Sequence, residues 1–194
     1  MIRSEGQLQG DDWKNIQDPR WPIIHYFNEP ERAGISPQHA AEIWHEQLVP
    51  LRKQHGKKLA SPSCASDEAG HKWLTEFMQL VKSEPPDFVG VHYYGTEASA
   101  AREYLEGIHH AYPKHKIIVS EIAAISRDRD KVSDFTRNIA NWMDETDWIF
   151  EYGFFGCMEH MPDNFVSPAA RLMTEDGHLT KLMHELMNEE PIKK

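Results

Sequence analysis

The chain has 194 residues, and its 21 Lys and Arg face 31 Asp and Glu, which gives a formal net charge of −10 at pH 7. This length fits a single domain with a substantial core. The negative charge argues against nucleic acids and anionic membranes as partners, because both favour basic surfaces.

Further features narrow the class of protein. No apolar run approaches the roughly 18–20 residues that a membrane helix needs. The segment Met1–Asn15 is charged and lacks an apolar block, so no secretory signal peptide begins the sequence. Cys64 and Cys157 have no zinc-type spacing and are expected to be free thiols. The 12 histidines form no HExxH pair, so we expect no metal and no cofactor. No protein partner can be inferred.

Apolar segments at strand length alternate along the chain with amphipathic segments at helical spacing. The predicted strands are Ile23–Phe27, Lys58–Ser61, Phe88–Tyr93, Ile117–Ser120 and Ile149–Phe155. The predicted helices are Ser36–Gln54, Gly70–Lys82, Ser99–Tyr112, Lys131–Glu145 and a last one near Leu179–Met187.

The strand ends recur about every 31 residues, the average length of one unit in an eight-unit β/α barrel. An open doubly wound sheet shows the same alternation. However, polar or aromatic residues follow every predicted strand, and the carboxyl ends of the strands form the active-site rim in barrels. No GxGxxG turn follows the first strand. The sequence therefore predicts an α/β fold, a TIM-type (β/α) barrel.

Two glutamates end two of the predicted strands. Glu29 lies in Asn28-Glu29-Pro30 directly after the first strand, and Glu121 follows Ile117–Ser120. A pair of such carboxylates is what hydrolysis of a glycosidic bond requires, one to protonate the leaving oxygen and one to attack the sugar. The alternatives are a simple turn residue for Glu29 and a hydrogen-bonded structural carboxylate for Glu121.

Other strand-end residues are candidate substrate contacts. His92 and Tyr94 share a face of their strand because side chains alternate along it. Ser61 and Ser63 would form a shelf under the substrate. For His92 and Tyr94 the alternative is a polar group satisfied within the core. Ser61 and Ser63 are less specific, because small polar residues are common at strand ends.

Several segments, in order and with matching spacing, resemble glycoside hydrolase family 128, the Asl1-like glycosyl hydrolase catalytic domains of fungi and some bacteria. The matching segments are Phe27–Glu31, Ile35–Pro37, Ala40–Trp44, Ser61–Ser63, Val91–Gly95, Val119–Ala123 and Phe154–Gly156. The resemblance implies a retaining, endo-acting hydrolase of β-1,3-glucan, located outside the cell or in the cell wall. The lack of a signal peptide leaves cytoplasmic retention open.

The resemblance also assigns roles to residues. It implies that Glu29 is the general acid/base at the end of the fourth strand and that Glu121 is the nucleophile at the end of the seventh. The substrate contacts would be Asn28, Ser61, Ser63, His92, Tyr94 and Phe154. The ligand would be a β-glucan polysaccharide or oligosaccharide.

The chain departs from the family pattern in two places. Phe154-Phe155-Gly156 stands where the family usually has Trp-Phe-Gly. The phenyl ring of Phe154 offers a sugar a smaller surface than the indole ring of a tryptophan. If Glu29 ends the fourth strand, the first three β/α units are absent and strands four to eight are present. We therefore expect residues 1–21 to be a remnant of the helix before the fourth strand, residues 22–190 a partial catalytic barrel and residues 191–194 a tail.

A barrel without its first units would expose strand edges, so weak or absent activity and self-association are expected. Two other functions stay open on the sequence. One is a non-catalytic glucan-binding or cell-wall protein, or an inactive barrel fragment. The other is a small open-sheet enzyme acting on phosphorylated substrates, which the lack of a Gly-rich phosphate loop disfavours.

Overall fold

The computed structural model describes residues 1–188 and 191–192. The chain forms two compact units. The first unit comprises Met1–His92 with Lys114–Ile118, and the second comprises Tyr93–Pro113 with Val119–Lys194. The expected tail, residues 191–194, and the end of the expected catalytic segment fall partly outside the described residues.

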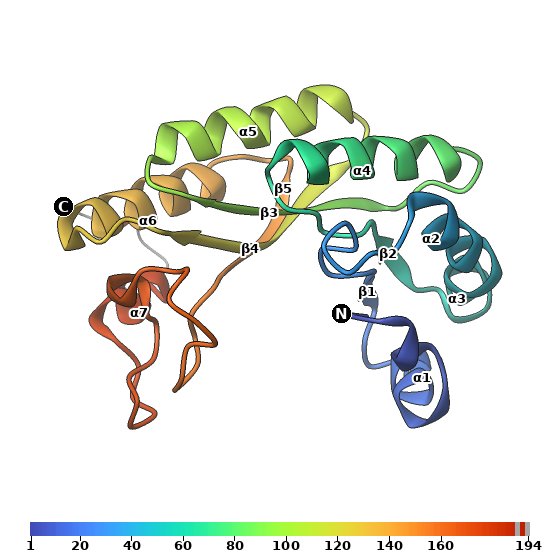
Figure 1. Ribbon diagram of the computed structural model, residues 1–194, viewed down its shortest axis with the longest axis horizontal. Helices are drawn as coiled ribbons and strands as arrows, with labels where there is room; N and C mark the ends of the chain where they lie inside the picture. The colour runs from blue at the N-terminus through green and yellow to red at the C-terminus, as the bar shows by residue number, and fades with distance from the viewer. Residues whose placement is uncertain (189–190, 193–194) are drawn as a thin grey trace. The chain divides into compact units, whose positions relative to one another are not determined.

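All five predicted strands are present, and they form one sheet in the order β1-β2-β3-β4-β5 (Figure 1). Their bounds are β1 Ile23–His25, β2 Lys58–Ala60, β3 Phe88–Gly95, β4 Lys116–Ala124 and β5 Ile149–Phe154. β1 pairs with β2 in parallel, and β2 pairs with β3 in parallel. The α/β prediction is confirmed.

The strand order favours barrel-type connectivity over the doubly wound alternative. A doubly wound sheet reverses its strand order at a switch point, whereas here each strand is a neighbour of the next one in the chain. The expectation that the first three β/α units are absent stays a prediction.

In the first unit, one predicted helix is divided into three pieces. Ser36–Gln54 was predicted as continuous, and the structure has α2 (Pro37–Ile43), a π-helical turn η2 (Trp44–Leu48) and α3 (Val49–His55). Pro50 has no N–H to continue the α-helical ladder. The N–H of Val49 instead bonds to the carbonyl of Trp44, five residues back. A single π-helical turn thus connects α2 to α3 without ending the helical path of the chain.

The core of the first unit is an aromatic cluster beneath α2 and α4 (Glu68–Leu80). Tyr26 stacks on Phe27 at a centroid distance of 4.1 Å and also contacts Trp44 and Phe77. All four rings are fully buried. Tyr26 donates its hydroxyl hydrogen bond to the carbonyl of Ala40 at 2.9 Å, which satisfies the polar end of the ring. This cluster anchors the chain directly before the Glu29 turn.

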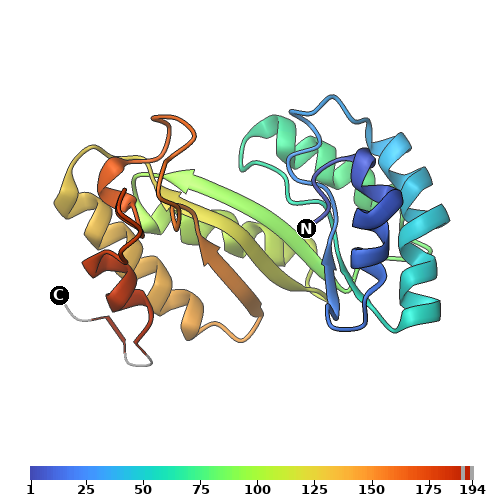
Figure 2. The ribbon, with the colours of Figure 1, turned by 90° about the horizontal axis from the view of Figure 1, so that it is seen from below.

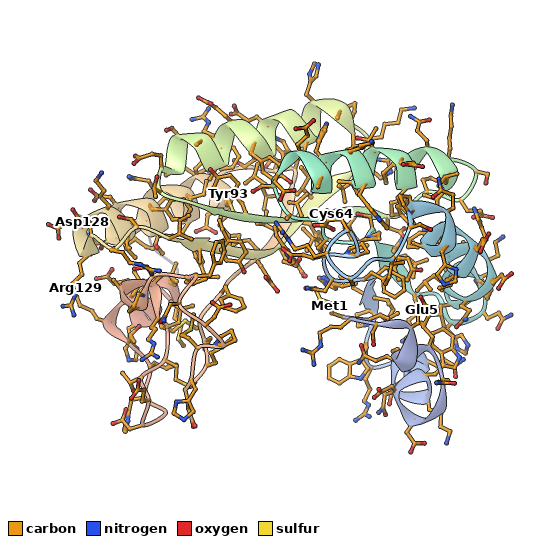
Figure 3. All side chains as sticks on the ribbon, viewed as in Figure 1. Met1, Glu5, Cys64, Tyr93, Asp128 and Arg129 are labelled. Carbon is orange, nitrogen blue, oxygen red and sulfur yellow. The ribbon has the colours of Figure 1, made fainter. Side chains whose placement is uncertain are left out.

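The N-terminal segment is built into the first unit. It contains a 3₁₀ turn, η1 (Glu5–Leu8), and the helix α1 (Gly10–Gln17). Ile2 is 1% exposed, and its N–H bonds to the carbonyl of His25 in β1 at 2.8 Å. The carboxylate of Glu5, which is labelled in Figure 3, lies 3.0 Å from Nε2 of His39 in α2. The buried Lys57 donates from Nζ to the carbonyls of Asp18 and Trp21.

The second unit packs its helices around the carboxyl-terminal parts of the sheet. α5 (Ala98–Ala111) and α6 (Arg129–Asp144) contact each other, and α6 also contacts the 3₁₀ turn η3 (Pro168–Ala170) and α7 (Lys181–Leu186) (Figures 1 and 2). The largest fully buried side chains at this α5–α6 interface include Leu105 and Phe135. Among the described residues, no helix is both long and apolar enough to cross a membrane.

Candidate active site

Glu29 sits on a turn whose backbone is held in an unusual conformation. Its φ is 40°, and among the described residues it is the one non-glycine residue with a positive φ. The N–H of Glu29 bonds to the carbonyl of Ser63 at 2.9 Å, and the N–H of Ser63 bonds to the carbonyl of Phe27 at 3.0 Å. A left-handed conformation costs an ordinary residue about 1–2 kcal/mol. Such strain clusters at functional sites, where the surrounding bonds hold it in place.

The carboxylate of Glu29 has two basic neighbours. Its Oε1 is 3.1 Å from Nδ1 of His92, and its Oε2 is 3.4 Å from Nε of Arg32. Arg32 in turn pairs with Asp67 at 2.8 Å. The hydrogen bond from His92 lowers the pKa of Glu29 below its usual value, while partial burial acts in the opposite direction. In this form of the protein Glu29 is therefore ionised at neutral pH, although an acid catalyst must carry a proton.

Glu121 lies within β4 and has a different kind of neighbour. The hydroxyl of Tyr94, at the end of β3, donates to Oε2 of Glu121 at 2.6 Å. A short hydrogen bond to a carboxylate is stronger than one between neutral groups. This bond helps to fix the orientation of the Glu121 side chain.

Aromatic rings surround Tyr94. Its ring meets the ring of Phe155 at 6.0 Å and the ring of Phe165 at 5.2 Å, both edge to face. Phe165 is 55% exposed. The second unit thus combines a carboxylate, a phenol and a solvent-facing aromatic surface.

Phe154, the predicted aromatic contact, lies elsewhere. Its ring contacts Tyr152 at 5.9 Å, and the hydroxyl of Tyr152 donates to Asp144 of α6. Side chains alternate along a strand, so Phe154 faces the helix layer. The ring beside Tyr94 belongs to Phe155, whereas the sequence pattern predicted Phe154 as the aromatic contact.

The two serines are fully buried, as is His92. The hydroxyl of Ser61 accepts the N–H of Gly90 at 2.9 Å and donates to the carbonyl of Pro62 at 3.0 Å. A Cβ at Gly90 would lie 2.5 Å from Oγ of Ser63, so β3 runs close beneath this segment. Asn28 is partly exposed and forms a bridge with Ser63 beside the Glu29 turn. These positions support the turn from below.

The structure therefore groups the predicted residues into two clusters, one in each unit. Asn28, Glu29, Ser63 and His92 meet in the first unit, and Tyr94 and Glu121 meet in the second. Sequence reasoning missed Arg32, Asp67 and Phe165. Arg32 follows the turn by three residues and could have been suspected, whereas no sequence signal connects Asp67 or Phe165 to the glutamates.

Both cysteines are free thiols. Cys64 is buried, and burial, followed by the charge of Glu31, raises the pKa of its thiol. Cys157 is exposed. A buried thiol with a raised pKa is a poor nucleophile, so Cys64 offers no alternative chemistry to the glutamates. Within the part of the chain that the structure describes, no three His, Cys, Asp or Glu side chains gather closely enough to hold a metal ion.

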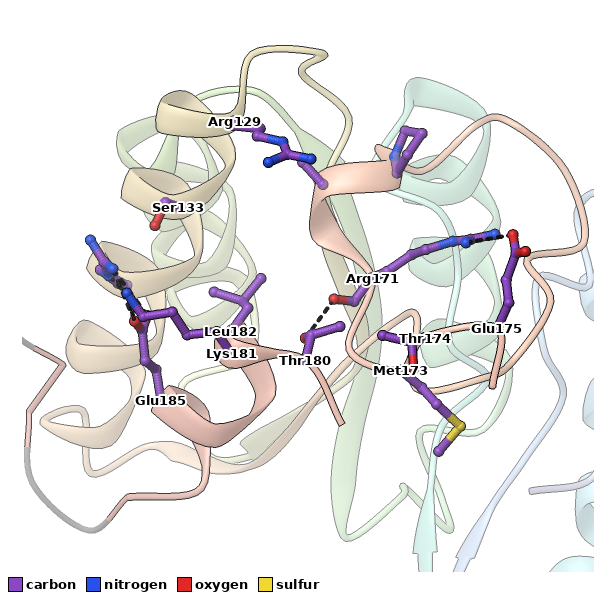
Figure 4. Close-up of a pocket in the computed structure, with 13 residues that line it drawn as sticks. Arg129, Ser133, Arg171, Met173, Thr174, Glu175, Thr180, Lys181, Leu182 and Glu185 are labelled. Atoms are coloured by element: carbon purple, nitrogen blue, oxygen red, sulfur yellow. Dashed lines mark hydrogen bonds and ion pairs between the residues drawn. The ribbon is translucent and has the colours of Figure 1, made fainter. Parts of the chain in front are cut away.

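The second unit also contains a cavity of about 590 Å³ between α6, η3 and α7 (Figure 4). Its charged lining is largely paired, since Arg137 contacts Glu185 at 3.1 Å and Arg171 contacts Glu175 at 3.0 Å. Glu121 and Tyr94 are not among the residues that line it. This cavity is separate from the cluster around Glu121.

Comparison with known proteins gives consistent results. The family model described as the glycosyl hydrolase catalytic core matches residues 1–185. A solved exo-β-1,3-glucanase from Aureobasidium namibiae, in subgroup VI of glycoside hydrolase family 128, is 49% identical. Its TM-score is 0.98, and the match covers 100% of this chain and 78% of that one.

Two other matches are more distant. An oligosaccharide-binding protein from Cryptococcus neoformans, in subgroup VII of the same family, is 20% identical with a TM-score of 0.75, covering 95% of this chain and 76% of that one. Alkali-sensitive linkage protein 1 of Schizosaccharomyces pombe is 31% identical over 87 residues. That match covers 42% of this chain and only 16% of the curated relative's length. The chain belongs to the glycosyl hydrolase catalytic core family and to glycoside hydrolase family 128.

Proposed function

We propose that the protein hydrolyses β-1,3-glucan. The observation that carries this proposal is that both strand-end glutamates are held by side chains of β3, Glu29 by His92 and Glu121 by Tyr94. Most glycosidases use a pair of positioned carboxylates for catalysis. The 49% identity to an exo-β-1,3-glucanase along the whole chain supports this substrate.

The same relative indicates whether the protein cleaves glucan chains internally or from their ends. The sequence pattern suggested endo action, whereas the relative at 49% identity is an exo-acting enzyme. We therefore favour release of sugars from chain ends. A polysaccharide substrate of this kind is met outside the cell or in the cell wall.

In the proposed retaining mechanism, Glu121 attacks the anomeric carbon while Glu29 protonates the leaving glycosidic oxygen. Glu29 then acts as a base on water, which releases the sugar from Glu121. The hydrogen bond from Tyr94 keeps the Glu121 carboxylate oriented for attack. Phe155 and Phe165, beside Tyr94, offer apolar ring surface to a glucosyl unit.

The lowered pKa of Glu29 requires an account of its proton. An imidazole nitrogen can donate to an ionised carboxylate or accept from a protonated one. The 3.1 Å contact between His92 and Glu29 therefore serves both states. We propose that Glu29 holds its proton when the leaving oxygen of the substrate lies beside it.

The remaining predicted residues take supporting roles in this proposal. Asn28 is exposed enough to reach a sugar hydroxyl. Ser61 and Ser63 are both buried. The backbone of Ser63 bonds to Phe27 and Glu29 and would hold the turn in its left-handed conformation, whereas Ser61 bonds to Gly90 and Pro62.

The decisive experiment measures hydrolysis of laminarin and laminari-oligosaccharides by the chain and by its Glu29→Gln and Glu121→Gln variants. The expected result is sugar release by the parent chain and a loss of orders of magnitude in each variant. A variant that keeps more than about a tenth of the parent activity would refute the role assigned to that residue.

The second candidate is an oligosaccharide-binding protein without turnover. The lowered pKa of Glu29 favours it, because an ionised carboxylate cannot act as the acid. The family includes solved proteins of this kind. Saturable binding of laminarihexaose by the parent chain, with no products after prolonged incubation, would establish this candidate over the first.

A further inference from the structure

A second concave pocket, of about 390 Å³, opens at the ends of α5 and α6. Its walls come from the C-terminal half of α5, from the end of α6 and from the segment between α6 and β5. All of its lining residues belong to the second unit. None of them is needed for the hydrolysis proposed above.

Aromatic rings form most of one wall. Trp142 and Trp148 are both half-buried, and their rings meet edge to face at 5.5 Å. His109 stacks on Trp148 at 4.4 Å with an interplanar angle of 4°. Arg102 lies 5.5 Å from the centroid of the Trp142 ring. These contacts fix the two indoles as a rigid surface, so little side-chain entropy is lost when a ligand packs on it.

The rest of the lining is polar but carries little net charge. Glu106 is the carboxylate of the pocket, and Arg102 bonds to it at 2.7 Å. Thr146 donates to the carbonyl of Trp142 at 2.6 Å, which leaves its oxygen lone pairs as acceptors. His110, on the exposed side, adds a further donor or acceptor.

This combination selects one ligand chemistry. An anion would need unpaired cations in the lining, and a cation would need unpaired carboxylates, but Glu106 and Arg102 neutralise each other. A purely apolar ligand would leave the polar groups unpaired. A pyranose ring has C–H faces that pack on aromatic rings and an edge of neutral hydroxyls. The lining therefore fits a neutral saccharide.

The pocket lies at the opposite end of β5 from the aromatic cluster around Tyr94. Trp148 directly precedes β5, and Phe155 directly follows it. The six residues of β5 span roughly 20 Å at about 3.3 Å per residue. One sugar unit cannot occupy both places.

We propose that the pocket formed by His109, Trp142 and Trp148 is a second glucan-binding site, which holds a β-glucan chain while the glutamates act elsewhere. The identity of the saccharide as β-glucan rests on the proposed function. A polymer bound at this pocket has a higher local concentration at the glutamates. The second site therefore increases the affinity of the protein for long chains and insoluble glucan. It has no effect on oligosaccharides too short to reach it.

The test uses the full chain carrying Glu121→Gln, so that the polymer is not consumed. Retention on insoluble β-1,3-glucan is compared with and without Trp148→Ala or Trp142→Ala. Loss of one stacking contact is expected to weaken retention about tenfold. Trp21→Ala is the matched control, because Trp21 is 57% exposed but lies outside this pocket, and it should leave retention unchanged.

The same tryptophan substitutions are also placed in the chain with Glu121 intact, and hydrolysis of laminaritetraose is measured. Unchanged hydrolysis with weakened retention supports the second site. Unchanged hydrolysis with unchanged retention overturns it and leaves the proposed function standing. If the parent chain hydrolyses no β-1,3-glucan oligosaccharide, the proposed function fails, whatever the retention shows.

If an alanine variant does not fold, the indole ¹H–¹⁵N resonances of the Glu121→Gln chain decide the question. Trp142→Phe and Trp148→Phe identify the two signals. Laminarihexaose should shift both signals and leave that of Trp21 in place. Unshifted Trp142 and Trp148 signals at saturating laminarihexaose would overturn the second site.

Discussion

The two glutamates differ in how the fold controls them. Glu29 lies on a strained turn and contacts two basic side chains, His92 and Arg32. Glu121 lies in a regular strand and accepts a hydrogen bond from the hydroxyl of Tyr94. Basic neighbours change the proton affinity of a carboxylate, whereas a single phenol chiefly orients it.

This difference matches the two tasks of a retaining glycosidase. The acid/base must change its protonation state twice in each cycle, so it needs a partner that also exchanges protons. The nucleophile stays ionised until it forms a bond, so it needs only a fixed direction. Measurements on substituted variants test whether the two glutamates differ in this way.

The largest effects are expected from the glutamates themselves. Glu29→Gln and Glu121→Gln should each lower laminarin hydrolysis by orders of magnitude. An aryl glucoside with an acidic leaving group separates the roles, because such a group departs without protonation. Glu29→Gln should still release the aryl alcohol, whereas Glu121→Gln should not. Release by Glu121→Gln at the rate of Glu29→Gln would contradict the assignment.

Next in size is the loss of the hydroxyl beside Glu121. Tyr94→Phe keeps the ring that packs on Phe155 and Phe165 and removes the hydrogen bond. Because a hydrogen bond to a charged group contributes about 1.5–3 kcal/mol, kcat/KM should fall at least tenfold with little change in thermal stability. Phe155→Leu keeps the Tyr94 hydroxyl and removes the neighbouring ring, so comparing the two variants separates the effect of the hydrogen bond from that of the aromatic surface. A Tyr94→Phe variant with the parent kcat/KM would show that Glu121 is oriented by other contacts.

The partner of Glu29 should affect the pH dependence. The His92 hydrogen bond is the largest influence that lowers the pKa of Glu29, and burial opposes it. His92→Phe should therefore raise this pKa, so Glu29 keeps its proton to higher pH. The alkaline limb of the kcat/KM profile should move to higher pH, while the acidic limb, set by the nucleophile, stays in place.

Arg32 provides a graded check on this prediction. Its charge also lowers the pKa of Glu29, but less than His92 does. Arg32→Gln should move the alkaline limb in the same direction by a smaller amount. Movement of that limb to lower pH in either variant would mean that it does not report on Glu29.

The smallest effect concerns the backbone of the Glu29 turn. Glycine adopts a positive φ without strain, so Glu29→Gly should be about 1 kcal/mol more stable than Glu29→Ala. Urea denaturation of the two inactive variants measures this difference. Equal stabilities would show that the turn is not strained. The parallel pair at Glu121, in a regular strand, should show the opposite order, because glycine weakens strands.

Sequence reasoning succeeded where local patterns decide the structure. The five strands, four of the helices and the place of Glu29 in a turn after the first strand follow from apolar periodicity and from Asn28-Glu29-Pro30, whereas β4 continues past Glu121 to Ala124. It failed where the structure depends on contacts distant in sequence. The ion pair of Arg32 with Asp67 spans 35 residues, and the exposed Phe165 lies in a loop without periodic pattern.

Two differences between the predicted and the observed structure have local causes that the sequence contains but does not resolve. Pro50 lies inside an otherwise helical pattern, and a proline both permits a first turn and interrupts a ladder. It produced the π-helical turn Trp44–Leu48. Phe154 and Phe155 are adjacent, and only the exact register of β5 determines which ring faces Tyr94.

The buried ammonium of Lys57 has a practical consequence for handling the protein. Its acceptors are the carbonyls of Asp18 and Trp21, and the neighbouring β1 is bonded by Ile2. A shortened recombinant version that begins at Ile23 would leave the Lys57 ammonium without these two acceptors and would uncover the edge of β1. Residues 1–21 should therefore be kept intact in expression work, and affinity tags should be attached away from Met1.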